Sequence, residues 1–124
     1  MAARIKSYKE LRVFNEAFEL AMEIFHISKQ FPSEEKYSLT DQIRRSSRSV
    51  SANIAEATRK RRYEKHFVSK LPDSDAENSE TQTWLEFSFA CNYISKEEFD
   101  KLTDKSLEVG KLLNYMMNNL DKFL

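Results

Sequence analysis

Basic side chains are dense in the middle of the chain, and their spacing suits contact with phosphate groups. Nine lysines and arginines but only two acidic residues lie between Gln42 and Lys70, a net charge of +7. On a helix that turns about 100° per residue, most of the arginines share one side, opposite the apolar positions. Clustered cations release counterions from a phosphate backbone when they bind it. The predicted nucleic-acid-binding residues are Arg44, Arg48, Arg59, Lys60, Arg61, Arg62 and Lys65.

The same charges have two other interpretations. One is a solvated surface, as most charged runs are. The other is docking between copies of the chain, because the stretch from Leu71 to Glu108 has ten acidic residues and three lysines, a net charge of −7. A head-to-tail contact between the two blocks would close into a ring if its rotation allowed. Four adjacent cations from Arg59 to Arg62 repel one another, which favours an anionic partner over plain solvation.

A second stripe on the same expected helix is polar and lies between its apolar and basic sides. In a helical bundle such residues most often form a hydrogen-bonded network between helices, with a buried arginine paired to a carboxylate. We predict a structural network of Gln42, Arg45, Ser49, Asn53, Glu56 and, from the next helix, Glu80. Nearby, Tyr63 and Phe67 could stack on bases. They could equally begin the core seam of the next helix, and we favour that interpretation.

Catalytic and metal-binding patterns are nearly absent from the sequence. Glu23 and His26 match one Glu-x-x-His element, but a di-iron bundle needs that element on two helices, with two further glutamates. Asp73, Glu77 and Glu80 share one helical side, which favours a solvated acidic face over a cation site. We expect Cys91, the single cysteine, to be a small buried hydrophobe. The predictions are therefore no enzyme activity, no metal and no cofactor.

The elements that position these residues are predicted to be four helices. Cap-like sequences begin three of them, at Ser7, Ser38 and Ser95. The third helix is expected from Tyr63 to Cys91, with a kink or restart at Pro72. The first carries two apolar seams, and a second seam would suit either a helix wedged deep in its bundle or a contact with another subunit. The last carries the most regular apolar seam, Phe99, Leu102, Ser106, Val109, Leu113, Met116, Leu120 and Phe123.

Composition agrees with a helical fold. The 124 residues are 40% hydrophobic and 32% charged, with one glycine, two prolines and a formal charge of zero. So little glycine disfavours all-β folds and phosphate-binding glycine loops. No apolar run has the length of a signal peptide or a membrane span, and one cysteine allows no internal disulfide, so we expect a cytoplasmic protein. We predict one all-α domain over residues 1–124, an antiparallel up-down four-helix bundle.

Several motifs resemble a known family. They are Leu39 to Arg45, then Ser49 to Glu56, with Phe31-Pro32 at the first turn and Glu80 to Phe87 in the third helix. Together they resemble the four-helix-bundle proteins encoded in intervening sequences of bacterial 23S ribosomal RNA genes. The resemblance covers nearly the whole chain. Two departures are Ala57, where the family usually has glycine, and Pro72, where its third helix is normally uninterrupted.

The resemblance implies an up-down bundle that assembles as a homo-oligomer, in known members a pentameric ring. A related protein, the accessory variability protein of diversity-generating retroelements, is a basic pentamer that binds nucleic acid and a reverse transcriptase. The resemblance thus implies a non-enzymatic accessory protein with copies of itself, RNA or DNA, and a partner protein as candidate partners. The neutral charge of this chain differs from that basic relative. The alternative function is a structural or protein-interaction module without a nucleic-acid role.

Overall fold

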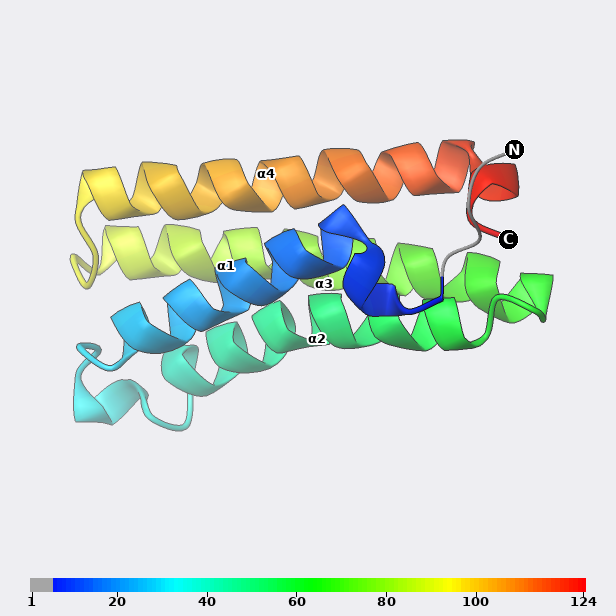
Figure 1. Cartoon of the computed structure of the whole chain (residues 1–124). Coiled ribbons are helices and arrows are strands. Elements are labelled where there is room, and N and C mark those ends of the chain that lie inside the picture. The colour runs from blue at the N-terminus through cyan, green and yellow to red at the C-terminus, as the bar shows by residue number, and fades with distance from the viewer. Residues whose placement is uncertain (1–5) are drawn as a thin grey trace.

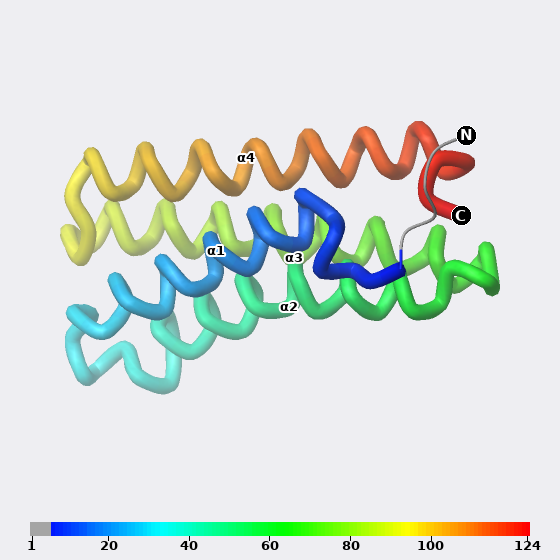
Figure 2. The backbone as a smooth tube through the Cα atoms, in the orientation of Figure 1, coloured from blue at the N-terminus to red at the C-terminus, as the bar shows by residue number. Residues whose placement is uncertain are grey.

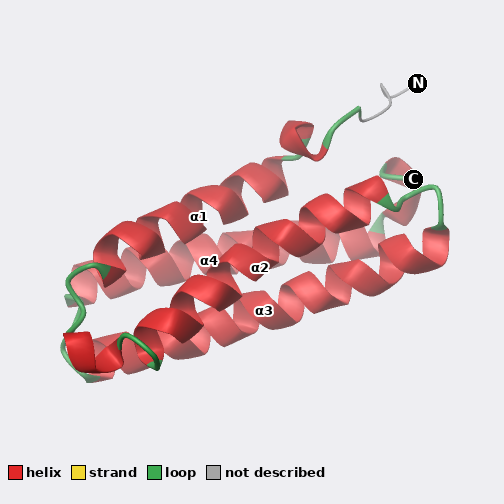
Figure 3. Cartoon of the chain, turned by 90° about the horizontal axis from the view of Figure 1, so that it is seen from below, coloured by secondary structure: helices red, strands yellow, loops and turns green. Residues whose placement is uncertain are grey.

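Four long helices account for most of the fold in the computed structural model, which describes residues 6–124. They are α1 (Arg12–Ser28), α2 (Leu39–Arg59), α3 (Glu64–Ala90) and α4 (Lys96–Asn118). Each runs antiparallel to the one before it, and the loops lie at the two ends (Figures 1 and 3). Each helix packs against two others, in the cyclic order α1, α2, α3, α4, and the described residues contain no strand. The predicted all-α up-down bundle is confirmed.

Only one of the three predicted cap sequences caps a long helix as expected. Before α4, Ser95 Oγ accepts from the Glu98 amide at 3.1 Å and Glu98 Oε1 accepts from the Ser95 amide at 2.8 Å, the predicted capping box. The cap at Ser7 instead begins a short 3-10 turn, Tyr8–Glu10, and α1 starts only after the extended residue Leu11. Ser38 precedes α2, but its hydroxyl donates to Glu35 and does not cap the helix.

Pro72 lies inside α3 without ending it. The sequence predicted a kink or a restart, whereas one helix runs from Glu64 to Ala90. Proline removes a single helical hydrogen bond, here the one to the carbonyl of Val68. Pro72 and Val68 are both exposed, so water can satisfy that carbonyl. None of the helices within residues 6–124 has the length and apolar character needed to span a membrane.

The core consists of two apolar clusters with a polar layer between them. One cluster is centred on Val50, Phe67 and Leu113, and the other on Ile24, Ile43 and Leu85. The polar layer contains five buried side chains from α2, α3 and α4 that hydrogen-bond between helices: Ser46, Ser74, Asn78, Thr81 and Ser106. The buried seam of α4 is as predicted from Leu102 to Met116.

The two apolar seams of α1 differ in how deeply they are buried. Val13, Ala17, Leu20 and Ile24 are buried in the bundle. The other seam is mixed, since Leu11 and Ala21 are buried, Phe14 and Phe25 are half-buried, and Phe18 is 52% exposed. Part of the second seam is therefore packed inside the bundle, and part of it is exposed. The other interpretation, contact with another subunit, stays a prediction for the exposed part of this seam, at Phe18.

Candidate nucleic-acid interface

The seven predicted basic residues fall into two groups. Arg44 and Arg48 lie along α2 beside α1, where their guanidinium groups are 4.9 and 5.5 Å from the ring centre of Phe25. Arg44 Nε also donates to Ser28 Oγ at 2.8 Å. Cation–π contacts and a charge-assisted hydrogen bond stabilise the α1–α2 packing. Arg44 is therefore a packing residue as well as a surface cation.

The other five residues gather where α2 meets α3. Arg59 ends α2, Lys60 to Arg62 form the turn, and Lys65 is in the first turn of α3. Lys60 forms an ion pair with Glu56 at 3.2 Å. Within the described part of the chain, Arg59, Arg62 and Lys65 form no ion pair. Their charge is thus not neutralised by the residues that the structure describes.

A hollow of about 380 Å³ opens at this junction. Its lining consists of six residues: Lys6, Thr58, Arg59, Arg61, Arg62 and Tyr63. No carboxylate is among them, so four cations converge on one concave surface, an arrangement that suits an anion. The sequence analysis missed Lys6, because only the fold brings the start of the chain beside the α2–α3 turn. We call these six residues the junction hollow.

The two aromatic residues near the junction have opposite environments. Phe67 is 1% exposed and belongs to the core, as predicted. Tyr63 is 61% exposed and is one of the residues that line the junction hollow, so the prediction that it begins the core seam is wrong. Its ring lies 6.1 Å from that of His66 at 85°. Position explains the difference, since Tyr63 precedes α3 and is not yet on its inward face.

The predicted polar network does not form as one buried cluster within the chain. Gln42 is exposed, and the side chain of Arg45 is 74% exposed, 3.7 Å from Asp41 on the same helix. Asn53 donates to the carbonyl of Ser49, one turn away. This stripe lies on the outer edge of α2, where long charged side chains reach water. The buried network is the polar layer of short side chains described above.

The two glutamates of the predicted network have separate partners. Glu56 accepts from Lys60, which directly follows α2, and from Lys70 of α3 at 3.3 Å, and these hydrogen bonds lower its pKa. It is the one member of the predicted set that links α2 to α3 by an ion pair. Glu80 Oε1 accepts from Trp84 Nε1 at 3.2 Å. Glu80 therefore does not pair with Arg45.

The candidate metal ligands have other roles. Glu23 lies 3.5 Å from Lys101 and 3.4 Å from Lys105, and these pairs join α1 to α4. His26 is exposed. Burial and the neighbouring carboxylates Glu80 and Asp73 raise the pKa of Glu77, in keeping with the predicted acidic face. Among residues 6–124 no three His, Cys, Asp or Glu side chains are grouped as a metal site.

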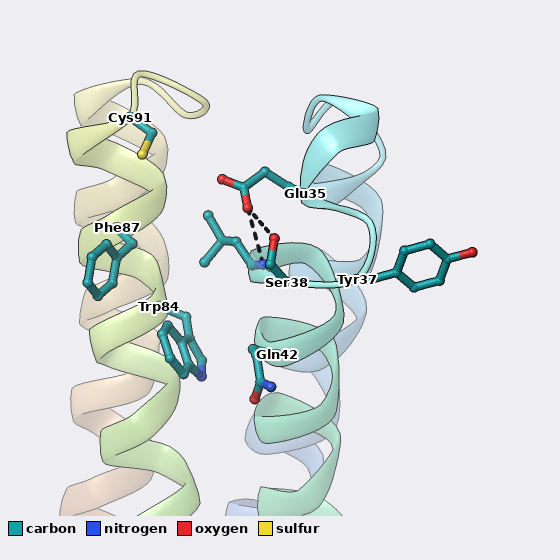
Figure 4. A pocket seen from close by; sticks show the side chains of 8 residues that line it. Glu35, Tyr37, Ser38, Gln42, Trp84, Phe87 and Cys91 are labelled. Atoms are coloured by element: carbon teal, nitrogen blue, oxygen red, sulfur yellow. Dashed lines mark hydrogen bonds between the residues drawn. The ribbon is translucent and has the colours of Figure 1, made fainter.

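A second hollow, of about 390 Å³, lies between the start of α2 and the C-terminal half of α3 (Figure 4). Trp84 and Phe87 line it from α3, with ring centres 5.9 Å apart. Leu39 faces them from α2, and Cys91 lies near the end of α3. Cys91 is exposed, so the expectation of a buried cysteine is wrong. This apolar hollow is at the opposite end of the molecule from the junction hollow.

Comparisons with known proteins place the chain in a family. A model of the 23S rRNA-intervening sequence protein family matches residues 9–115. A solved structure from Bacteroides thetaiotaomicron, a protein of unknown function from the S23 ribosomal protein family, is 32% identical, with a TM-score of 0.77 over 86% of this chain and 95% of that one. No curated protein matches. Because the family match covers most of the chain, the protein belongs to the 23S rRNA-intervening sequence protein family.

Proposed function

We propose that this protein is a non-enzymatic, homo-oligomeric accessory protein that binds structured RNA or DNA through the α2–α3 junction. The observation that carries the proposal is the junction hollow, where four cations converge without a carboxylate among the lining residues. A phosphate backbone would interact with these cations and release counterions on binding. The name of the family refers to 23S rRNA, which makes RNA the first ligand to test.

The junction is a better primary surface than the Arg44–Arg48 group. Arg44 already donates to Ser28, and both guanidinium groups lie over Phe25. Binding a phosphate there would compete with contacts that join α1 to α2. Phosphate contacts alone carry little sequence information, so binding at the junction should discriminate weakly between sequences.

Fluorescence anisotropy with a labelled RNA hairpin tests the proposal. The variant Arg59→Gln/Arg62→Gln/Lys65→Gln should bind at least about tenfold more weakly at low salt, and its log–log salt slope should be shallower by about 2 to 3, near 0.9 per phosphate contact. The matched control is Lys29→Gln/Lys36→Gln/Lys96→Gln, which removes the same charge from the opposite end of the bundle. Equal losses in the two variants would mean that only net charge matters, and the proposed site would fail.

Self-assembly is the second part of the proposal. Phe18 and Met22 on α1 and Phe87 on α3 are large apolar side chains left exposed by the fold. Large exposed apolar side chains favour a contact between copies, and Phe87 also lines the apolar hollow. We expect the variant Phe18→Gln/Phe87→Gln to lower the mass measured by light scattering, whereas Val68→Gln, at another exposed apolar position, should leave it unchanged. A protein that is already monomeric before mutation would contradict this part.

The alternative function, a protein-interaction module without a nucleic-acid role, is favoured by the acidic side of α3. Asp73, Glu77 and Glu80 interact with one another there and could meet the basic junction of a second copy. Such a charge-held assembly should dissociate between about 0.1 and 1 M salt, because salt screens exposed charges. Assembly that persists at high salt while RNA binding is lost would assign the cations to RNA.

A further inference from the structure

We propose that the junction hollow binds an unpaired nucleotide, with its phosphate held by the cations and its base stacked on Tyr63. This inference rests on the proposed function and adds the class of nucleic acid that the site takes. It follows from the position of one exposed tyrosine and several cations, all of which line a single hollow. Aromatic rings beside a basic groove are the common means by which proteins hold single strands.

Backbone hydrogen bonds order the main chain at Tyr63, which therefore does not belong to an irregular loop. Its amide donates to the carbonyl of Lys60 at 2.9 Å, and its own carbonyl accepts from the amides of His66 and Phe67 at 2.9 and 3.1 Å. Phe67 is anchored in the core one turn later. The Tyr63 ring is therefore held at the start of α3 while most of its surface faces water. Because the backbone of Tyr63 is already ordered, only its side-chain torsions lose conformational entropy when a base stacks on the ring.

The surroundings of Tyr63 suit both the phosphate and the base of a nucleotide. Lys6, Arg59 and Arg62 line the same hollow and supply donors for a phosphate. The His66 ring stands nearly perpendicular to the Tyr63 ring, so the two exposed rings form a corner rather than a stacked pair. No other described aromatic ring contacts Tyr63. A planar base can therefore approach the phenol ring.

The geometry favours unpaired over duplex nucleic acid. In a duplex the faces of the bases are covered by their neighbours, and only phosphates and groove edges are exposed. The Tyr63 ring can therefore add to the affinity for a nucleic acid only if a base is unstacked from its neighbours. Loops, bulges and ends of a structured RNA provide such bases at no unstacking cost.

The chain offers a matched control in Tyr37. Tyr37 is 85% exposed and lies beside a cation, with Lys36 Nζ 5.3 Å from its ring centre. It is in the α1–α2 connection at the opposite end of the bundle, where it borders the apolar hollow with its ring directed outwards (Figure 4). A general effect of removing a surface tyrosine should thus appear equally in Tyr37→Leu and Tyr63→Leu.

The experiment uses the full chain and a 12-nucleotide purine RNA that carries one 2-aminopurine. Binding is measured by anisotropy for the single strand and for the same strand annealed to its complement, and stacking by quenching of the 2-aminopurine fluorescence. Tyr63→Leu should weaken single-strand binding about tenfold and abolish the quenching, while duplex binding changes less than about twofold. Tyr63→Phe should retain both properties, and Tyr37→Leu should resemble the wild type. Circular dichroism checks that the variants remain helical.

Two results would overturn the inference and are distinct from failure of the proposed function. Wild-type affinity and quenching in Tyr63→Leu, or tighter binding of the duplex than of the single strand, would exclude base stacking at this residue. If the Arg59, Arg62 and Lys65 triple variant still loses RNA affinity in that case, the phosphate-binding function stands without the stacking. If the triple variant also binds like the wild type, both proposals fail.

Discussion

Asn78 of α3 and Ser106 of α4 are joined by two hydrogen bonds in the centre of the bundle. Ser106 Oγ donates to Asn78 Oδ1 at 2.8 Å, and Asn78 Nδ2 donates to the carbonyl of Ser106 at 2.9 Å. Gln82 Nε2 also donates to Ser106 Oγ at 3.0 Å. Both Asn78 and Ser106 are buried. The serine hydroxyl is therefore at once the donor for one amide side chain and the acceptor for another.

Replacing Ser106 with alanine should destabilise the protein by about 1 to 3 kcal/mol. The change leaves the buried Asn78 oxygen without its donor and Gln82 without its acceptor, and unsatisfied buried polar groups have costs of this size. Guanidinium unfolding at a fixed protein concentration measures the difference. Ser79→Ala, at an exposed position of α3, is the control and should change stability by less than about 0.5 kcal/mol. Equal effects would show that the hydroxyl contributes nothing specific.

Replacing Pro72 with alanine should stabilise the protein by about 1 to 3 kcal/mol. Proline inside a helix loses one hydrogen bond and strains the preceding turn, whereas alanine has the best helix propensity. The side chain is exposed, so its loss leaves no cavity. The rise in the thermal midpoint is the measurement. A lower midpoint would show that Pro72 makes a contact that the isolated chain does not, for example with another subunit.

Arg44→Gln and Arg45→Gln remove equal charge from neighbouring positions but should differ in stability. Arg44 loses its hydrogen bond to buried Ser28 and its place over the Phe25 ring, together about 1 kcal/mol. Arg45 loses only an exposed pair with Asp41, which contributes less than about 0.5 kcal/mol. Urea unfolding of the two variants side by side tests the order. A larger loss in Arg45→Gln would contradict the packing role of Arg44.

Acid should remove the stabilisation that Glu56 provides. Hydrogen bonds from Lys60 and Lys70 lower the pKa of Glu56 below its usual 4.5 in the folded state. A lowered folded pKa means that the stabilisation is present above the unfolded pKa and is lost as pH falls through the folded one. Glu56→Gln should therefore have a lower thermal midpoint than the wild type at pH 7, and the gap should narrow as the pH falls from 7 to well below 4.5. A constant gap across this range would exclude the ionised carboxylate as the cause.

The fold was predictable because its signals are local and repeated. Apolar residues at steps of three and four mark α1, α2 and α4, and Ser95 begins a capping box that forms as predicted. The start of α1 was not predictable from its cap, because Leu11 takes an extended conformation before the helix begins. At Pro72 a local rule failed too, since an exposed turn tolerates the missing hydrogen bond.

The candidate site was only partly predictable. The charge run from Arg59 to Arg62 stands out in the sequence, whereas Lys6 joins it only after the chain has folded. Tyr63 and Phe67 are four residues apart, yet only Phe67 turns inwards, and a seam pattern does not show where the first inward position begins. The polar network was assigned to the wrong stripe of α2. Long polar side chains suggested it, whereas short hydroxyls such as Ser46 and Thr81 form the buried one.

The band of hydroxyl and amide groups across the middle of the bundle, between its two apolar ends, fixes the alignment of the rods. Figure 2 shows the four helices as long rods that lie lengthwise along one another. A helix displaced along its axis by one turn, about 5.4 Å, would still make apolar contacts with its neighbours at both ends of the bundle. It would, however, bring Asn78 against hydrocarbon and separate Ser46 from Thr81. The central polar band thus specifies the register of the helices, because only one alignment along their axes pairs every buried donor with an acceptor.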